Sequence, residues 1–312
     1  MAQIDRVLRS NLKLRHLQML VALDQFRHLG RAAEFLALTQ PAVSKTLAEI
    51  ESMFGLPLFE RSTRGTEPTA AGASVVRFAR SVLAGYERTR DEIAAEASGA
   101  SGRASVGAMV SATPVLLAQA VERLKACSRR ATVLIEEGDL AHLLPKLRLG
   151  ELDLFLGRLE PAYAAPDLQT EPLYEDPMAA VVRPGHPLAR RRTVKWADLA
   201  EQPCVLPPPW ASLRVKLEQQ FFAHDLHPPV DIVESASFLS QLSFMHQRGA
   251  VAFMARTVAR HFAQHGILEQ LGLAVRIELP PVGLITLRGQ RLTPVTALLV
   301  ECLREGVKTL RR

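Results

Sequence analysis

Leu38-Thr39-Gln40-Pro41-Ala42-Val43-Ser44-Lys45 is the stretch that decides the fold of the N-terminal part of the chain. Pro41 suits the first turn of a helix, where its missing N–H costs nothing and its fixed φ angle helps. Apolar side chains then recur on one helical face, at Val43, Leu47, Ile50 and Phe54. The stretch therefore predicts a turn followed by an amphipathic helix that ends before Gly55.

The residues upstream predict two more helices. Residues 14–28 place an apolar stripe at helical intervals, and Gly30 separates them from the Ala-rich residues 31–37. Two helices joined by a short turn, with a polar outer face on the second, form the motif that enters a DNA major groove. The alternative is a small three-helix bundle whose polar face is merely solvated.

The residues downstream predict a wing and a long helix. Residues 56–61 read as a strand and residues 62–67 as a polar loop around Arg64-Gly65, which together fit a hairpin. Thr69 can cap a helix with apolar residues at alternating spacings of four and three, which indicates a paired helix and hence a dimer. The predicted seam contains Val75, Ala79, Val82, Tyr86 and Ile93.

The C-terminal part has a different pattern. Ser98-Gly99-Ala100-Ser101-Gly102 marks the boundary, and beyond it strand and helix patterns alternate, which predicts α/β architecture with parallel sheets. We expect strands at 103–110, 131–137 and 152–159, then a second unit beginning with a strand at 178–183. The tail from residue 274 is predicted to hold a strand pair and a final helix.

Composition sets broad limits. The chain has 312 residues, 48% of them hydrophobic, and a formal net charge of +6, which suits a soluble globular protein and permits a nucleic-acid partner without proving one. The three cysteines lie far apart and are expected to be reduced. With no secretory leader or run of about 18 apolar residues, we expect a cytoplasmic protein with no membrane partner.

Several motifs together identify a family resemblance. They are Ala32-Ala33-Glu34, Thr39 to Lys45, Leu58-Phe59-Glu60-Arg61 and Pro68-Thr69-Ala70-Ala71-Gly72, and the chain resembles LysR-type transcriptional regulators in all of them. A looser match extends through Gly150 to Leu154, Arg183 to Ala189 and Gly249 to Ala252. Within the family, the chain resembles regulators of sugar and aromatic-acid catabolism.

The resemblance implies where DNA is contacted. Gln40 would pair with an adenine edge, Lys45 with guanine or phosphate, and Ser44 with either. The predicted DNA-binding residues are Arg31, Thr39, Gln40, Pro41, Ser44, Lys45 and, on the wing, Arg64. Two departures stand out: His28-Leu29-Gly30 lacks the hydroxyl that commonly caps the second helix, and Lys45 replaces the commoner arginine.

The resemblance also implies the domain plan. It comprises an all-α winged helix-turn-helix at 1–68, a linker and dimerisation helix at 69–102, and a two-lobed, periplasmic-binding-protein-like α/β effector domain. Its first subdomain would combine 103–174 with 268–312, and its second would span 175–267. The two would hinge around a cleft for a small effector.

Residue chemistry favours the same cleft, because ligands of open parallel sheets sit beyond the carboxyl ends of strands and helix N-termini attract anions. The candidate effector ligands are Ser111, Thr113, Gly138, Arg158, Pro209, Trp210, Ser235 and Ser237. Thr113 could instead be only a helix cap, Arg158 a surface charge and Trp210 part of a packed loop. A carboxylate effector is favoured, although an uncharged sugar derivative would use similar groups.

Signatures of other functions are missing. The sequence contains no G-x-S-x-G, H-E-x-x-H, G-x-x-x-x-G-K or G-x-G-x-x-G motif, so we predict neither an enzyme nor a cofactor. His261 and His265 have helical spacing but no third metal ligand, so no metal is expected. The basic triplet Arg190 to Arg192 is interpreted as a solvated loop.

The predicted partners are double-stranded promoter DNA, a small effector, further copies of the chain in a dimer and tetramer, and RNA polymerase. Three rivals stay open at this point: a solute-binding receptor, an enzyme that uses the cleft, and a constitutive DNA-binding protein without an effector response.

Overall fold

A computed structural model describes residues 2–62, 65–98, 102–209 and 211–310. It divides into two compact units, residues 1–103 with 145–152 and residues 104–144 with 153–312. Across the described ranges, no helix is long and apolar enough to cross a membrane.

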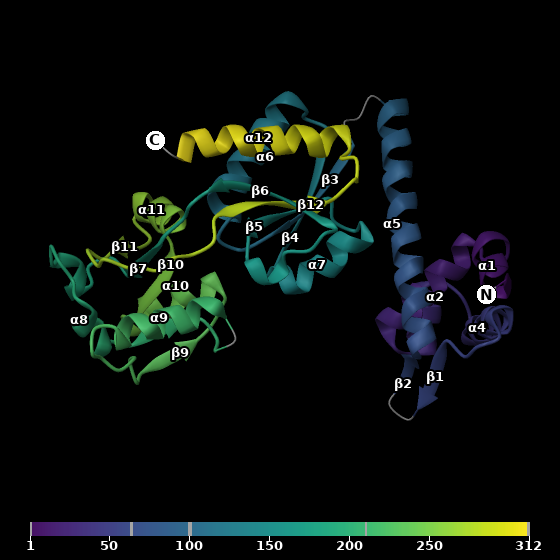
Figure 1. Ribbon diagram of the computed structural model, residues 1–312, viewed down its shortest axis with the longest axis horizontal. Coiled ribbons are helices and arrows are strands. Elements are labelled where there is room, and N and C mark those ends of the chain that lie inside the picture. The colour runs from purple at the N-terminus through teal and green to yellow at the C-terminus, as the bar shows by residue number, and fades with distance from the viewer. Residues whose placement is uncertain (1, 63–64, 99–101, 210, 311–312) are drawn as a thin grey trace. The chain divides into compact units, whose positions relative to one another are not determined.

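The first unit is a helical domain with a two-stranded hairpin, followed by one long helix (Figure 1). Its elements are α1 (Ala2–Arg6), the π-helical segment η1 (Val7–Asn11), α2 (Leu14–Phe26), α3 (Leu29–Phe35), α4 (Gln40–Phe54), β1 (Phe59–Ser62), β2 (Gly65–Pro68) and α5 (Ala70–Ser98). The apolar faces predicted for α2 and α4 meet in one core, which includes Leu20, Leu23, Leu47 and Ile50. The winged helix-turn-helix fold is confirmed. The sequence did not predict α1 and η1.

The start of α3 has no capping hydroxyl, as the sequence indicated, but His28 caps it instead. The imidazole Nδ1 of His28 accepts hydrogen bonds from the backbone N–H groups of Gly30, at 3.1 Å, and Arg31, at 3.4 Å. These are N–H groups that a helix leaves unsatisfied at its N-terminus. The helix therefore begins at Leu29 rather than at Arg31, and an imidazole replaces the expected hydroxyl.

Hydrogen bonds from its backbone N–H groups hold the hairpin against α2 and α4. The N–H of Thr66 donates to the carbonyl of Arg27 at 2.9 Å, and Glu51 Oε1 accepts from the N–H groups of Leu58 and Phe59. Gly65 has φ +130°, and a Cβ there would lie 2.5 Å from the Arg27 carbonyl oxygen. The wing can therefore approach α2 this closely only with glycine at that position. Arg64, at the predicted wing tip, lies outside the described residues.

Helix α5 begins in tight contact with the same hairpin. Thr69 Oγ1 accepts from the N–H of Gly72 at 3.0 Å, which confirms the predicted cap, and donates to the Pro57 carbonyl at 2.8 Å. A Cβ on Gly72 would lie 1.8 Å from the Leu58 carbonyl oxygen. Ala79 is fully buried within the single chain, so its assignment to the dimer seam is wrong. The physical reason is that α5 packs on α2 along this stretch.

The first sheet of the second unit has the order β4-β3-β5-β12-β6. Its strands are β3 (Arg103–Ala108), β4 (Thr132–Glu137), β5 (Leu154–Arg158), β6 (Leu168–Tyr174) and β12 (Val282–Leu287). Strands β3 and β5 are parallel as predicted, but β12 runs antiparallel to both β5 and β6. The expectation of a parallel sheet therefore holds for β3 and β5 but not for β12. The predicted strand pair in the tail is wrong, because β12 pairs with β5 and β6, which lie more than 100 residues earlier in the chain.

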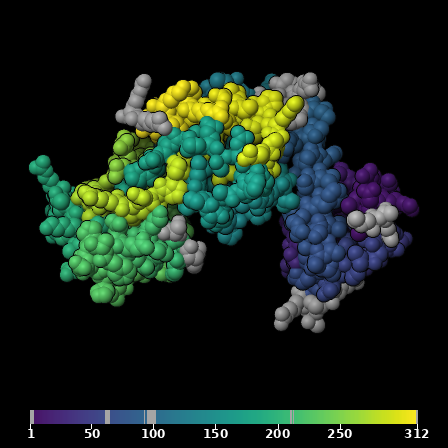
Figure 2. Space-filling model, viewed as in Figure 1, coloured from purple at the N-terminus to yellow at the C-terminus, as the bar shows by residue number. Residues whose placement is uncertain are grey.

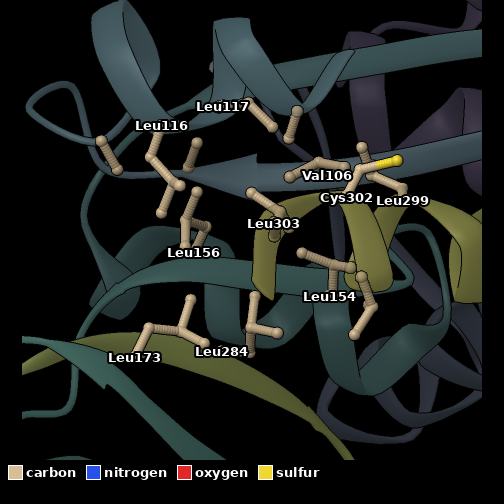
Figure 3. Packing of buried hydrophobic residues seen from close by; sticks show 14 of the residues in the cluster. Val106, Leu116, Leu117, Leu154, Leu156, Leu173, Leu284, Leu299, Cys302 and Leu303 are labelled. Atoms are coloured by element: carbon tan, nitrogen blue, oxygen red, sulfur yellow. The ribbon is translucent and has the colours of Figure 1, made fainter. Parts of the chain in front are cut away.

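Helices cover this sheet and close its core. The π-helical segment η2 (Thr113–Leu117) continues into α6 (Ala118–Cys127), which packs beside α12 (Pro294–Leu310); α7 (Leu140–Leu149) follows β4. Figure 3 shows side chains of η2 and α12 meeting those of β3 and β5, among them Leu116, Leu303 and Leu156. Asp153, buried before β5, accepts hydrogen bonds from the Ser105 N–H and the Thr296 hydroxyl. The core therefore joins segments from both ends of this unit.

The second sheet has the order β11-β7-β10-β8-β9. Its elements are β7 (Met178–Val182), the 3-10 turn η4 (Pro187–Arg190), α8 (Trp196–Ala200), β8 (Cys204–Leu206), α9 (Ser212–Phe222), β9 (Ile232–Glu234), α10 (Phe238–Arg248), β10 (Val251–Ala255), α11 (Arg256–Gln264) and β11 (Glu269–Gln270). Leu271, Val275 and Ile277 join its core, so this stretch belongs to the second sheet and not to the first as the domain plan expected. We call residues 178–277 the second lobe.

The chain passes between the two sheets twice. It leaves the first sheet after β6 and returns through residues 271–281, the yellow-green band in Figure 2. Arg158, at the end of β5, donates to a carbonyl in each passage, Asp176 on the way out and Pro280 on the way back. One side chain thus ties both connections to the first sheet.

Candidate nucleic-acid interface and ligand site

The exposed face of α4 carries the predicted DNA-reading residues. Thr39 caps the helix, with its Oγ1 accepting from the N–H of Ala42 at 3.4 Å. Gln40, Pro41 and Lys45 are exposed, and Ser44 is half-buried. Because Val43 and Leu47 are buried on the other side, the first turns of α4 present their polar groups outward. An amide and an ammonium so placed match base edges and phosphates respectively.

A close approach brings α3 beside this surface. A Cβ on Gly30 would lie 3.6 Å from Gln40 Oε1 and 3.1 Å from the His28 ring. The exposed Arg31 follows Gly30 directly. The structure therefore brings the start of α3 next to the start of α4, so Arg31 and Gln40 belong to neighbouring elements.

An ion-pair network that the sequence did not reveal positions the wing. Arg27, in the left-handed conformation with φ 49°, pairs with Asp24 at 2.8 Å and with Glu67 of β2. Asp24 also pairs with Arg80 of α5 at 3.0 Å. No motif distinguishes these charges from other surface charges, because Glu67 and Arg80 lie far along the chain from Arg27 and Asp24.

Thr113 gives the strongest signal of a ligand site. Its hydroxyl is buried, and it has no hydrogen-bond partner anywhere in the described chain. Thr113 begins η2, whose flanking residue Ala112 supplies no side-chain cap. Buried polar groups are nearly always hydrogen-bonded, so an unpaired one requires an explanation. The reading of Thr113 as only a helix cap is therefore not supported.

Arg158 is not the surface charge that the sequence left as an alternative. It is 9% exposed, and its two terminal nitrogens donate to the Pro280 and Asp176 carbonyls at 2.8 and 2.7 Å. Burial lowers the pKa of its guanidinium, while the nearby Asp176 carboxylate opposes that shift. A ligand contact by Arg158 stays a prediction, and the structure gives this side chain a bridging role first.

The other candidates fall into two groups. Ser111 and Gly138 follow β3 and β4, and the N–H of Gly138 donates to the Ala108 carbonyl at 3.0 Å, so Ser111, Thr113 and Gly138 share one edge of the first sheet. Pro209, Ser235 and Ser237 follow β8 and β9 at one edge of the second. Ser237 Oγ caps α10 by accepting from the N–H of Ser240, and Ser235 Oγ accepts from the Ser237 N–H. Trp210 lies outside the described residues.

No group of three metal-ligating side chains occurs among the residues that the structure describes. The rings of His261 and His265 are 4.7 Å apart, but His265 Nδ1 is 2.8 Å from the His261 carbonyl oxygen. This pair is accounted for by packing along α11.

Comparison with known proteins identifies the same two parts. Residues 14–73 match the bacterial regulatory helix-turn-helix protein family of lysR type, and residues 97–308 match the LysR substrate binding domain. The chain is 32% identical over 308 residues to the HTH-type transcriptional regulator GbpR of Azospirillum brasilense, covering 98% of this chain and 90% of the relative. It is 30% identical to the regulator PcaQ of Agrobacterium fabrum, covering 96% of each.

Solved structures share the fold. The LysR family regulator CbnR superposes with a TM-score of 0.72 at 20% identity, covering 95% of this chain and 99% of CbnR. Full-length CbnR bound to its target DNA superposes with a TM-score of 0.71. Together with the matched domains and relatives, the helix-turn-helix and the two-sheet unit show that this chain belongs to the LysR family of DNA-binding transcriptional regulators, which carry an effector-binding domain.

Proposed function

We propose that α4 reads promoter DNA in the major groove through Thr39, Gln40, Pro41, Ser44 and Lys45. The observation that carries this proposal is the exposed polar turn at the start of α4, next to Arg31 of α3. Gln40 supplies the bidentate amide that recognises adenine, and Lys45 supplies charge for phosphate or guanine. The predicted contact by Arg64 on the wing is part of the same proposal.

Gln40→Ala is expected to weaken binding to the specific site by about 1–3 kcal/mol, the usual contribution of a bidentate base contact. The measurement is footprinting of the promoter region beside the gene, at fixed salt because phosphate contacts set the background. Ser44→Ala is compared alongside, and Gln264→Ala, an exposed glutamine of α11, is the matched control.

Comparison of the variants distinguishes sequence-specific recognition of bases from sequence-independent attraction to phosphates. Lys45→Met is expected to weaken binding to all sequences and to lower the salt slope by about one if Lys45 contacts phosphate. Equal, sequence-independent binding by the wild type, Gln40→Ala and Ser44→Ala would rule out reading by α4.

We further propose that α5 pairs with a second copy of the chain. Apolar side chains remain uncovered on it: Phe78 is 37% exposed, Tyr86 45% and Ile93 63%, while Val82 is half-buried. Phe78, which the predicted seam omitted, lies four residues before Val82 and therefore shares its face. Val75 packs partly on the winged domain itself.

Sedimentation equilibrium tests this pairing. A dimer that associates into tetramers would support it, and a protein that stays monomeric would contradict it.

We propose that a small effector binds beside Thr113, with Ser111 and Gly138 at the same sheet edge. The unpaired Thr113 hydroxyl supports this, because a ligand oxygen would supply its missing partner. An anion at the first turn of η2, which continues into α6, would also meet backbone N–H groups. A carboxylate therefore fits this edge best, and the second group, Pro209, Trp210, Ser235 and Ser237, completes the proposed set.

Thr113→Val tests whether that hydroxyl is free. Valine keeps the branched shape and removes a hydroxyl that makes no hydrogen bond to the described part of the chain, so the free energy of unfolding should stay within about 0.5 kcal/mol or rise. Urea denaturation measures this. A loss well above about 1 kcal/mol would mean that the hydroxyl is bonded inside the protein, and the main support for the effector site would fall.

Two further parts of the proposal rest on the regulatory role. A DNA-binding regulator of promoters acts where the chromosome lies, which places it in the cytoplasm, and promoter control gives it RNA polymerase as a partner. An unchanged footprint with every effector tested would favour the constitutive alternative.

A further inference from the structure

A pocket of about 320 Å³ lies in the second lobe, away from the strand edges that carry the proposed effector site. It is formed by the start of α8, the chain just after α9, and the first part of the return passage. Its walls include Lys195, Trp196, His224, Leu226, Leu273 and Ala274. Small-molecule sites are concave, mostly apolar and a few hundred Å³ in volume, so this pocket has the size and character of a small one.

A buried indole forms part of the wall. Trp196 is 3% exposed, and its ring stacks on Phe253 at 5.9 Å and meets Phe221 edge-on at 4.9 Å. Its Nε1 is buried and has no hydrogen-bond partner among the residues that the structure describes. A buried tryptophan N–H usually finds a partner, and leaving it unpaired costs free energy. An acceptor atom in the adjoining pocket would remove that cost.

The surroundings of the pocket carry positive charge. Lys195 is exposed at the pocket wall, and Arg190, Arg191 and Arg192 come just before it in the chain. The carboxylate of Asp198 is already engaged by the Arg191 guanidinium at 2.6 Å and the Lys195 N–H at 2.8 Å. An anionic ligand at this wall can therefore pair with the Lys195 ammonium, because the neighbouring Asp198 carboxylate already binds other groups.

We propose that this pocket is a second ligand site, which binds a small monocarboxylate with an aromatic or branched apolar body. The carboxylate pairs with Lys195, and the apolar body packs on Leu226 and Leu273. His224, whose Nδ1 lies 2.7 Å from the Gln220 carbonyl oxygen and whose ring centroid lies 5.9 Å from that of Trp196, lines the same wall, and the unpaired indole N–H supplies a donor for a ligand oxygen. Arg190 to Arg192, which the sequence left as a solvated loop, then contribute to anion attraction.

The position of the pocket gives it a regulatory consequence. Leu273 and Ala274 belong to the passage that returns to the first sheet and ends at Pro280, where Arg158 binds. A ligand that binds more tightly to one conformation of this passage than to another shifts the population toward the first conformation. This site goes beyond the effector site proposed at Thr113 and does not depend on it.

Tryptophan fluorescence can observe the pocket directly. The chain has two tryptophans, so Trp210→Phe leaves Trp196 as the sole reporter. In this full-length background, 3-phenylpropanoate should change the emission saturably, with one site per chain. The neutral analogue 3-phenylpropan-1-ol should bind more weakly, because it lacks the charge.

Variants then locate the binding. Lys195→Met should weaken 3-phenylpropanoate binding about two- to fivefold, as for a partly exposed ion pair, whereas Lys308→Met, which removes an exposed lysine of α12, should not. Ala274→Phe, which places a ring from an exposed position into the pocket, should abolish binding while thermal melting stays unchanged. Thr113→Val should leave it unaffected.

Four results would overturn the proposal, and three of them concern the pocket itself. They are no saturable change in Trp196 emission, undiminished affinity in a folded Ala274→Phe variant, and equal affinity for the acid and the alcohol in both the Lys195→Met variant and its parent. Loss of binding in Thr113→Val would also overturn it, because the probe would then occupy the other site.

Discussion

Arg158→Met is expected to lower the free energy of unfolding of the second unit by about 3 kcal/mol, because two carbonyl groups at a buried position lose their donor. Those carbonyls belong to Asp176 and Pro280, in the two passages between the sheets. Methionine fills much of the volume of the side-chain stem, so the loss reports the hydrogen bonds rather than a cavity. Urea denaturation followed by circular dichroism measures it.

The effect should extend along a chain of contacts. The Asp176 carboxylate accepts from both the N–H and the hydroxyl of Thr257, at the start of α11. Nearby Tyr174 is buried, and burial raises the pKa of its phenol. Arg158 thus holds a polar cluster in which each group depends on its neighbours.

A control and an alternative outcome make the Arg158 test decisive. Arg260→Met removes an exposed arginine of α11 and should change stability by less than about 0.5 kcal/mol. If Arg158→Met keeps full stability but loses the effector response, Arg158 acts as a ligand, as the sequence predicted, and the bridging role assigned by the hydrogen bonds is wrong.

Gly72→Ala is expected to destabilise the winged domain by about 3 kcal/mol, at the upper end of overpacking effects. Its new Cβ would lie 1.8 Å from the Leu58 carbonyl oxygen, a backbone atom that a rotamer change cannot move. The start of α5 would have to separate from the hairpin, which would also weaken the Thr69 contact with Pro57. Amide hydrogen exchange of residues 58–76 measures the loss locally.

Gly85→Ala is the matched control on the same helix. Among the described residues, no atom lies within 4 Å of a Cβ added there, so alanine should stabilise the helix by about 0.5–1 kcal/mol through its better helix propensity. If the two substitutions behave alike, the close approach of α5 to Leu58 does not exist in solution.

Local patterns predicted the elements well. The strands predicted at 131–137 and 178–183 match β4 and β7 to within one residue at either end, because each has a clear period or a flanking turn. The sequence missed β6 because its mixed residues have no strict alternation, and it did not predict the partners of the tail strand β12 because pairing between distant segments leaves no local trace. The His28 cap was missed because imidazole is an uncommon cap acceptor.

The candidate site was predictable only in part. Position after a strand suffices to nominate Thr113, and the exposed face of α4 follows from the burial of Val43 and Leu47. By contrast, the engagement of Arg158 depends on carbonyls 18 and 122 residues away. The Trp196 pocket is assembled from three separate segments, and no pattern in any one of them indicates it.

The pairing of β6 with β12 has a consequence for how this architecture could have arisen. Tyr174 of β6 lies opposite Val282 of β12 in antiparallel register, so the two strands relate to each other as the arms of a hairpin. The whole second lobe occupies the place of the hairpin turn. Because loop-closure entropy grows only slowly with loop length, a folded module can replace a turn at modest cost. This topology permits the second lobe to be acquired as an inserted module, because exchange of the module leaves the pairing of β6 with β12 unchanged.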